Sequence, residues 1–251
     1  MPRLRSISAN LPAADLTIRR LQRFVHLSDS ERALLRTTAE NGREVPAGYT
    51  IINEGERLDS ARLLLAGWAC RTRTFADGRR QIFEFILPGE MYGLCLRPQA
   101  VALAAAVTLT PAVIADASVI QDAYTHKQKE YPHLVAGLHC TASLDEAHLL
   151  NQLIRIGRQS AYERMAHLIL ELRERLSVVG LATADTMPLP LTQEMLADAL
   201  GLSIVHLNRT LQQLRRENLI IFKSGMMRIL QPDRLAEIAD FRPPKVTKAA
   251  A

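Results

Sequence analysis

The chain is poor in cysteine and in long apolar runs. Its three cysteines, Cys70, Cys95 and Cys140, are odd in number and widely spaced, which argues against a disulfide framework and against a Cys-x-x-Cys metal site. No stretch offers roughly 18 uninterrupted apolar residues, the length that a membrane helix needs. The charged N-terminus also lacks the apolar core of a signal peptide. We therefore expect a protein of the reducing cytoplasm with no membrane partner.

Sequence motifs of catalysis are missing as well. The chain contains no Gly-rich phosphate loop, no His-x-x-x-His metal pair and no Gly-x-Ser-x-Gly nucleophile elbow. We expect neither an enzyme, nor a bound metal, nor a cofactor.

What is present is enough chain for two globular cores. The sequence has 251 residues, of which 48% are hydrophobic, and this length exceeds one typical domain. The net charge of +5 and the pI near 9.4 suit a polyanionic partner. This excess of positive charge is modest and does not by itself indicate a nucleic-acid partner.

Residues 191–221 have the pattern of a helix-turn-helix. Thr192 is a good N-cap for a first helix, and Gly201 tolerates the positive φ of a tight turn. Ser203 then caps a second helix that we expect to run to about Glu217. The alternative is an ordinary helical hairpin whose charged face is merely solvated.

The second helix carries side chains suited to reading duplex DNA. Leu207, Leu211 and Leu214 recur at helical spacing and should face inward. Arg can grip guanine, Asn and Gln can pair with adenine, and an apolar residue can touch the thymine methyl. Residues 219–230 read as two short strands, a wing whose tip can reach a phosphate. The predicted DNA-binding residues are Thr192, Gln193, Ser203, Val205, His206, Asn208, Arg209, Gln212, Lys223 and Ser224.

The first part of the chain predicts two helices followed by a β domain. We expect helices over residues 15–24 and 29–40, the second introduced by capping residues at 28–30. From residue 44 to 119 short strand-like pieces alternate with turn residues, a pattern typical of a small β-barrel or sandwich, whose last piece covers 111–120. Asp77-Gly78 predicts a hairpin with a primed turn.

Residues 144–158 predict a helix that is apolar over more than half its girth. Such a helix has to bury two faces, and a second copy of the chain is the economical partner; the alternative is packing on its own barrel alone. The predicted dimerisation residues are Leu144, Ala147, Leu150, Ile154 and Gly157.

A capping box at residues 160–163 then starts a fresh helix, with a hinge at 158–160. We thus predict an effector domain at 15–140, a dimerisation helix at 141–159, a DNA-binding domain at 160–241 and a disordered tail at 242–251.

This order of parts resembles the Crp/Fnr family of bacterial transcription regulators over about residues 15–230. The resemblance is carried by turns at 54–55 and 89–90, by the strand 67–73 before 77–81, and by 201–209. It implies an α+β fold with a cyclic-nucleotide-binding-like jelly-roll barrel, a long dimerisation helix and a winged helix-turn-helix. It also implies a homodimer on a palindromic operator, with one recognition helix per half-site about one DNA turn apart, and RNA polymerase as a candidate partner.

Several positions depart from the family pattern. Many relatives have Glu at the position of Val205, and a valine offers only apolar contact. We therefore do not expect this chain to recognise the usual DNA half-site of the family. In cyclic-nucleotide sensors of the family, a Glu binds the ribose hydroxyl and an Arg-Ser pair binds the phosphate. These positions align with Leu94, Ala102 and Leu103, whose side chains have no polar group to bind ribose or phosphate. We therefore predict no response to cyclic AMP, and the small-molecule effector stays unidentified. Activator and repressor roles are not distinguished.

Other sensor chemistries find little support in the sequence. No cysteine precedes Cys70, which argues against an N-terminal iron–sulfur cluster, and Cys95 has no histidine near it in sequence to support haem. Cys95 is a candidate redox thiol, and the alternative is a small buried hydrophobe. A competing function is a small-molecule or redox receptor whose winged helix contacts protein, because Ile204, Val205 and Leu207 offer apolar surface.

Overall fold

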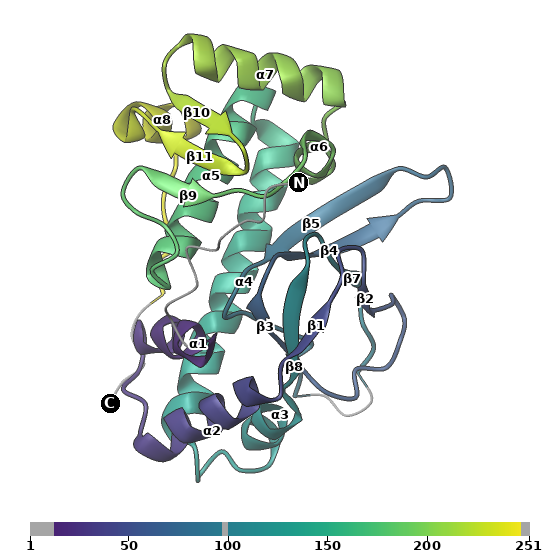
Figure 1. The fold of residues 1–251 in the computed structure, drawn as a ribbon, viewed down its shortest axis with the longest axis vertical. Coiled ribbons are helices and arrows are strands. Elements are labelled where there is room, and N and C mark those ends of the chain that lie inside the picture. The colour runs from purple at the N-terminus through teal and green to yellow at the C-terminus, as the bar shows by residue number, and fades with distance from the viewer. Residues whose placement is uncertain (1–12, 97–99, 247–251) are drawn as a thin grey trace.

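The computed structural model describes residues 13–96 and 100–246. Two layers of β-strand form one lobe, and a helical lobe with a small sheet forms the other (Figure 1). A single long helix, α4, runs along both lobes. The expected α+β architecture is confirmed.

The N-terminal helices follow local capping signals. Helix α1 spans Ala13–Gln22 and α2 spans Asp29–Glu40, close to the predicted ranges. At the start of α2 the Ser28 hydroxyl accepts a hydrogen bond from the Glu31 backbone N–H at 3.3 Å. The Glu31 carboxylate accepts one from the Ser28 N–H at 2.7 Å. This reciprocal capping box satisfies two otherwise unpaired donors.

Eight short strands form two antiparallel sheets that pack into a jelly-roll-like sandwich. One sheet has the order β1-β8-β3-β6 and the other β2-β7-β4-β5. The strands do not close into one sheet, so the predicted barrel is wrong. The sandwich, the other architecture that the strand pattern allowed, is the one observed. The strands are β1 Arg43–Val45, β2 Thr50–Ile52, β3 Arg62–Ala66, β4 Ala69–Thr74, β5 Arg80–Ile86, β6 Met91–Tyr92, β7 Ala105–Thr108 and β8 Ala112–Asp116.

The β4–β5 hairpin forms where Asp77-Gly78 predicted it, but with a different turn. Thr74 pairs with Arg80, so the loop contains residues 75–79 rather than two residues. Gly78 alone in this loop has a positive φ, of 84°. Asp77 instead accepts a hydrogen bond from the Arg79 backbone N–H at 3.0 Å. The primed two-residue turn was therefore wrong, because a longer loop needs only one left-handed residue.

The last strand ends earlier than its apolar pattern predicts. Strand β8 stops at Asp116, whose carboxylate accepts a hydrogen bond from the Ser118 N–H at 2.8 Å, and α3 runs over Ser118–Thr125. Helix α4 then spans Pro132–Arg158 and begins well before Leu144. Its start is capped from a distance, because the buried Glu31 carboxylate accepts a hydrogen bond from the Leu134 N–H at 2.8 Å.

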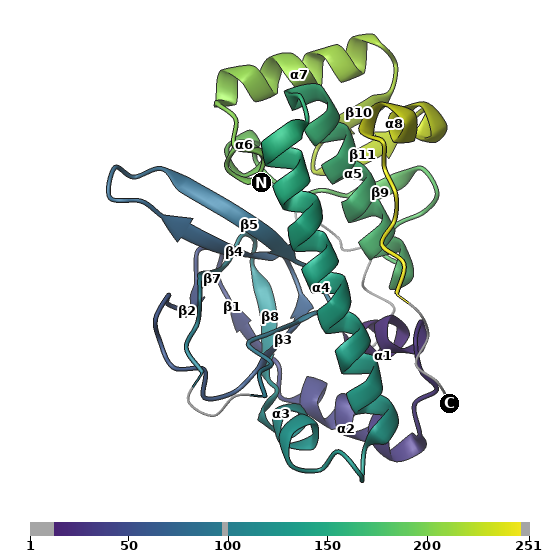
Figure 2. The same cartoon turned by 180° about the vertical axis from the view of Figure 1, so that it is seen from behind.

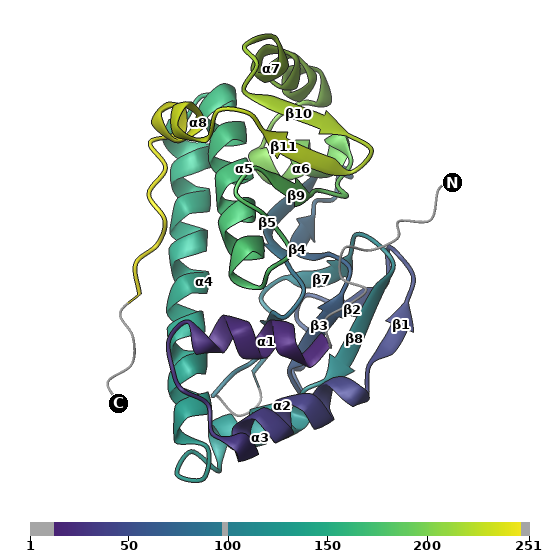
Figure 3. The same ribbon diagram turned by 60° about the vertical axis from the view of Figure 1, so that its left-hand side comes forward.

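The C-terminal lobe is a winged helix-turn-helix. Helix α5 starts at the predicted capping box, and the two helices of the motif and its two wing strands are present. The sequence reading missed β9, which pairs with β11, and the last helix, which packs on α5 (Figure 3). The elements are α5 Ala161–Val178, β9 Thr186–Pro188, α6 Gln193–Leu200, α7 Ile204–Arg216, β10 Ile220–Lys223, β11 Met226–Ile229 and α8 Pro232–Ala239.

The two lobes share one apolar core. Trp68 and Phe85 from the sandwich belong to the same buried cluster as Met165 and Ile169 of α5. Beyond α8, residues 242–246 have no regular secondary structure. Pro244 of this segment lies near Arg175 and Val178 of α5. The remainder of the predicted tail, 247–251, lies outside the described residues.

Candidate functional site

Two capped helices build the candidate DNA-reading surface. The Thr192 hydroxyl accepts a hydrogen bond from the Met195 N–H at 3.2 Å and so starts α6. Gly201 ends α6 in the left-handed conformation with φ 62°. The Ser203 hydroxyl then accepts from the His206 N–H at 3.2 Å and starts α7. The two N-caps, Thr192 and Ser203, each satisfy a backbone donor that the helix itself leaves open.

Helix α7 lies at one end of the molecule (Figure 1), and one of its faces carries polar side chains that are exposed. As predicted, the inner face of α7 is buried in the core of the C-terminal lobe through Leu207, Leu211 and Leu214. The opposite face carries the predicted base-reading residues: Val205, His206, Arg209 and Gln212 are exposed, and Asn208 is half-buried. Val205 has the most exposed apolar side chain of this face, at 62%. These residue types can pair with base edges in the major groove, which admits an α-helix.

The wing is a hairpin of β10 and β11 that follows α7. Ser224 and Gly225 both have positive φ, 52° and 74°, which suits a type I′ hairpin. Lys223 and Ser224 are exposed at this tip. Arg215 of α7 donates a hydrogen bond to the Phe222 carbonyl at 2.9 Å and fixes the wing to the helix.

The β4–β5 hairpin and α4 hold the C-terminal end of α6. Arg80 forms an ion pair with Asp198 at 2.7 Å, and the Gln81 amide donates to the Asp198 carbonyl at 2.9 Å. From α4, the Gln152 amide donates to the Ala199 carbonyl at 2.5 Å. The sequence reading missed these contacts because their partners lie far apart in the chain. These contacts attach α6 of the helix-turn-helix to the sandwich and to α4.

The outer side of helix α4 is not covered by any other element among the described residues (Figure 2), and apolar side chains lie on it. Leu150 and Ile154 are exposed, with Gly157 beside them, and Ala147 is half-buried. Leu144, which the sequence placed on this stripe, is only 7% exposed and packs inside the protomer. Leu153, which was not among the predicted dimerisation residues, lies on the outer side of the helix and is 68% exposed.

A cavity of about 280 Å³ lies between the sandwich and α4. Leu94, Ala102 and Leu103 line it, so the positions aligned with cyclic-nucleotide ligands do meet at one site. The sequence reading missed two cavity arginines from other elements. Arg20 pairs with Glu90 at 2.9 Å and Arg71 with Glu84 at 3.2 Å, and both pairs bridge separate elements.

A buried ionic network joins this cavity wall to α5. Arg175 lies 2.7 Å from Glu90 and 3.8 Å from Glu171, and it also donates to the Phe85 carbonyl at 2.7 Å. Burial acts to lower the pKa of Arg175, but the Glu90, Glu84 and Glu171 carboxylates outweigh it and raise that pKa. The guanidinium is therefore charged and paired with carboxylates from both lobes.

The cysteines occupy different environments. Cys70 is buried, and burial raises the pKa of its thiol to about 12. Cys95 is half-buried and lines the cavity, and its backbone is held by the Gln121 side chain. Cys95 therefore has the more accessible position of the two, and its redox role stays a prediction.

His167 predicts a loss of stability in mild acid. Burial, followed by the charge of Arg155, lowers the pKa of His167 from 6.5 to about 4. Arg155 donates toward His167 Nδ1 at 3.2 Å, which requires an unprotonated nitrogen. The unfolded chain takes up this proton near pH 6.5 and the folded protein only near pH 4. The stabilisation is therefore complete above pH 6.5 and is lost as the pH falls toward 4.

We expect urea unfolding to show the unfolding free energy falling between pH 6.5 and 5. His167→Gln keeps an acceptor for Arg155 and should reduce that slope by up to about one proton, or roughly 1.4 kcal/mol per pH unit. A slope identical in parent and variant would show that His167 does not titrate differently on unfolding.

Within the described residues no helix is both long and apolar enough to cross a membrane.

Comparison with known proteins matches both halves of the chain. Residues 42–118 match the family model described as a cyclic nucleotide-binding domain, and 163–238 match the Crp-like helix-turn-helix domain. The chain is 31% identical to the nitrogen fixation regulation protein FixK of Bradyrhizobium diazoefficiens over 215 residues, which cover 84% of this chain and 88% of FixK. It is 29% identical over 217 residues to the transcriptional activator protein FnrL of Cereibacter sphaeroides, covering 84% of this chain and 85% of FnrL.

Solved structures share this fold. FixK2 from Bradyrhizobium japonicum superposes with a TM-score of 0.67 at 24% identity, covering 84% of this chain and 98% of FixK2. A CRP-family transcriptional regulator from Thermus thermophilus superposes with a TM-score of 0.61 at 22% identity, covering 80% of this chain and 98% of that protein. At these identities the likeness concerns the fold alone.

Proposed function

This chain belongs to the Crp/Fnr family of transcription regulators, and from that premise we propose that it is a homodimer that reads a palindromic DNA operator. The observation that carries the proposal is the face of α7. A buried leucine row fixes the helix, and the opposite side exposes Arg209, Gln212 and His206 at the end of the molecule. A regulator rather than an enzyme is the role that this surface supports, in the cytoplasm, where its DNA is found.

Each part of the chain has a place in this proposal. Residues 15–140 receive the signal, the helix at 141–159 pairs two copies, and 160–241 read DNA. Arg209 and Asn208 supply base contacts, while Thr192, Gln193, Lys223 and Ser224 lie where phosphates would pass. Val205 offers a methyl contact where many relatives use a carboxylate, so we expect a half-site different from theirs. RNA polymerase is the partner if bound DNA leads to activation.

A gel shift with duplex DNA tests the proposal. Binding should weaken with salt, with log K falling by roughly 0.9 per phosphate neutralised against log salt. No shift with any duplex, or an affinity that does not depend on salt, would instead favour a winged helix that contacts protein.

Arg209→Ala should reduce operator affinity by about 1–3 kcal/mol, roughly 5- to 150-fold, and relax preference at one base pair. Lys223→Ala should weaken all sequences alike, because a phosphate contact carries no base information. Arg36→Ala on α2 is the matched control, since Arg36 is exposed at the far end of the molecule from α7. The role of Arg209 is wrong if its variant binds the best operator as tightly as the parent.

Cyclic AMP should not bind at micromolar concentration. Leu94, Ala102 and Leu103 offer no group for the ribose or the phosphate, and the cavity arginines Arg20 and Arg71 are held by carboxylates. A cyclic phosphate would have to break one of these pairs or remain buried without a counter-charge. Calorimetric titration of the full chain checks this, and a micromolar dissociation constant would refute it.

A further inference from the structure

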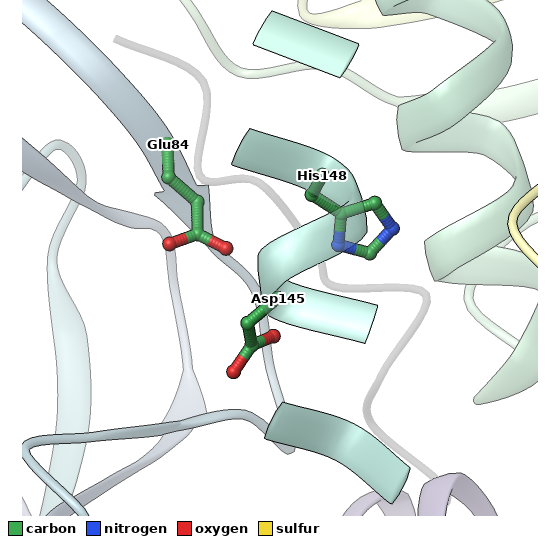
Figure 4. Close-up of side chains that lie close together, drawn as sticks. All are labelled: Glu84, Asp145 and His148. Atoms are coloured by element: carbon green, nitrogen blue, oxygen red, sulfur yellow. The ribbon is translucent and has the colours of Figure 1, made fainter. Parts of the chain in front are cut away.

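Three potential metal ligands converge where the sandwich meets the long helix. Glu84 comes from β5, and Asp145 and His148 lie three residues apart on one face of α4 (Figure 4). One carboxylate oxygen from each acid and one ring nitrogen lie within 4.8 Å of one another. All three residues line the 280 Å³ cavity. The sequence reading found no metal motif because Glu84 is remote from α4 in the chain.

His148 provides the observation that separates this group from an ordinary acidic cluster. Its side chain is only 6% exposed, and its Nδ1 has no hydrogen-bond partner in the structure. Figure 4 shows the ring with one nitrogen on the side of the two carboxylates. Buried polar atoms are nearly always partnered, so this nitrogen calls for an explanation. A neutral imidazole nitrogen is the form that ligates metals.

Glu84 and Asp145 lie close enough for their carboxylates to repel each other when both are ionised. Glu84 is held on one side by Arg71 at 3.2 Å and more loosely by Arg175 at 3.9 Å. A cation between Glu84 and Asp145 would offset this repulsion.

We propose that Glu84, Asp145 and His148 bind one divalent transition-metal ion of the Zn²⁺ type, which bridges the sandwich and α4. One nitrogen and two oxygens are a donor set that Zn²⁺ accepts, at 2.0–2.2 Å from the ion. Tetrahedral binding needs donors about 3.3 Å apart, so small rotations of the two acid side chains complete the site. Imidazole discriminates against Mg²⁺ and Ca²⁺, which prefer oxygen ligands.

Three protein ligands leave a fourth position that opens to the cavity, where water or a small ligand can bind. The ion would make the contact between β5 and α4 dependent on metal. This site goes beyond DNA reading, and its presence can be measured without DNA.

Calorimetric titration of the untagged, metal-free full chain with Zn²⁺ tests the proposal. We expect one Zn²⁺ per chain, and binding of Mg²⁺ at least a hundredfold weaker. His148→Ala and Asp145→Asn should each weaken Zn²⁺ binding at least tenfold. Asp145→Asn keeps the size of an accessible side chain, so it remains informative if His148→Ala folds poorly.

His126→Ala is the matched control, because His126 and Asp122 form a surface histidine–carboxylate pair on α3 and the segment after it. This variant should bind Zn²⁺ within twofold of the parent. The proposal is overturned if Zn²⁺ binds no better than Mg²⁺, if His148→Ala and Asp145→Asn bind Zn²⁺ like the parent, or if His126→Ala abolishes the binding.

Discussion

Replacing Ile154 with Asp should convert the proposed dimer into monomers and weaken binding to a two-half-site operator about a hundredfold or more. Ile154 is 52% exposed in the protomer, so the change should leave the fold of each chain intact. In a two-fold dimer, each α4 stripe would bury the new carboxylate against its copy without a counter-charge. Operator affinity falls because the second recognition helix no longer binds intramolecularly.

Sedimentation velocity and a gel shift on the same samples check this prediction. Val119→Asp is the matched control, since Val119 is an equally exposed apolar residue, at 51%, on α3 rather than on the stripe. The control should remain dimeric and bind the operator like the parent. A dimeric Ile154→Asp variant would show that α4 does not form the interface.

Arg175→Ala should be the most destabilising single change among the buried ion pairs, by about 3–5 kcal/mol. Removing the guanidinium leaves Glu90 and Glu171 buried with less positive charge around them, and it deletes the hydrogen bond to the Phe85 carbonyl. The loss should be large because Arg175 connects α5 to the sandwich. Urea unfolding at pH 7 and fixed protein concentration measures it.

The control for this change is Arg234→Ala on α8. Arg234 pairs with Glu237 at 3.0 Å, but both side chains are exposed. Surface pairs of this kind contribute little, so we expect a change below about 1 kcal/mol. Equal losses in the two variants would mean that burial of the Arg175 network has no energetic consequence.

Capping signals made much of this fold predictable from the sequence. Ser28, Ser160, Thr192 and Ser203 each start a helix where the sequence placed one, because an N-cap involves only a few adjacent residues. The buried leucines of α7 were predictable for the same reason, since helical spacing alone sets which side they occupy.

Contacts between distant segments were not predictable. The Arg80–Asp198 and Arg175–Glu90 pairs each join residues that no local pattern connects. The prediction that Leu144 lies on the dimerisation surface was wrong for a related reason. In a helix that is apolar over most of its girth, the sequence does not show which side faces the rest of the same chain. The helix starts earlier than predicted and contacts α1, and Leu144 lies near Arg20 and Phe24 on the inner side.

Selection of bound sequences from random duplex DNA tests whether two copies of this chain read a palindrome with α7. We predict two inverted copies of one short half-site, with centres about one helical turn apart, and loss of one base preference in the Arg209→Ala variant. Enrichment of a single unrepeated site, or of no sequence at all, would contradict a dimer that reads a palindrome with α7.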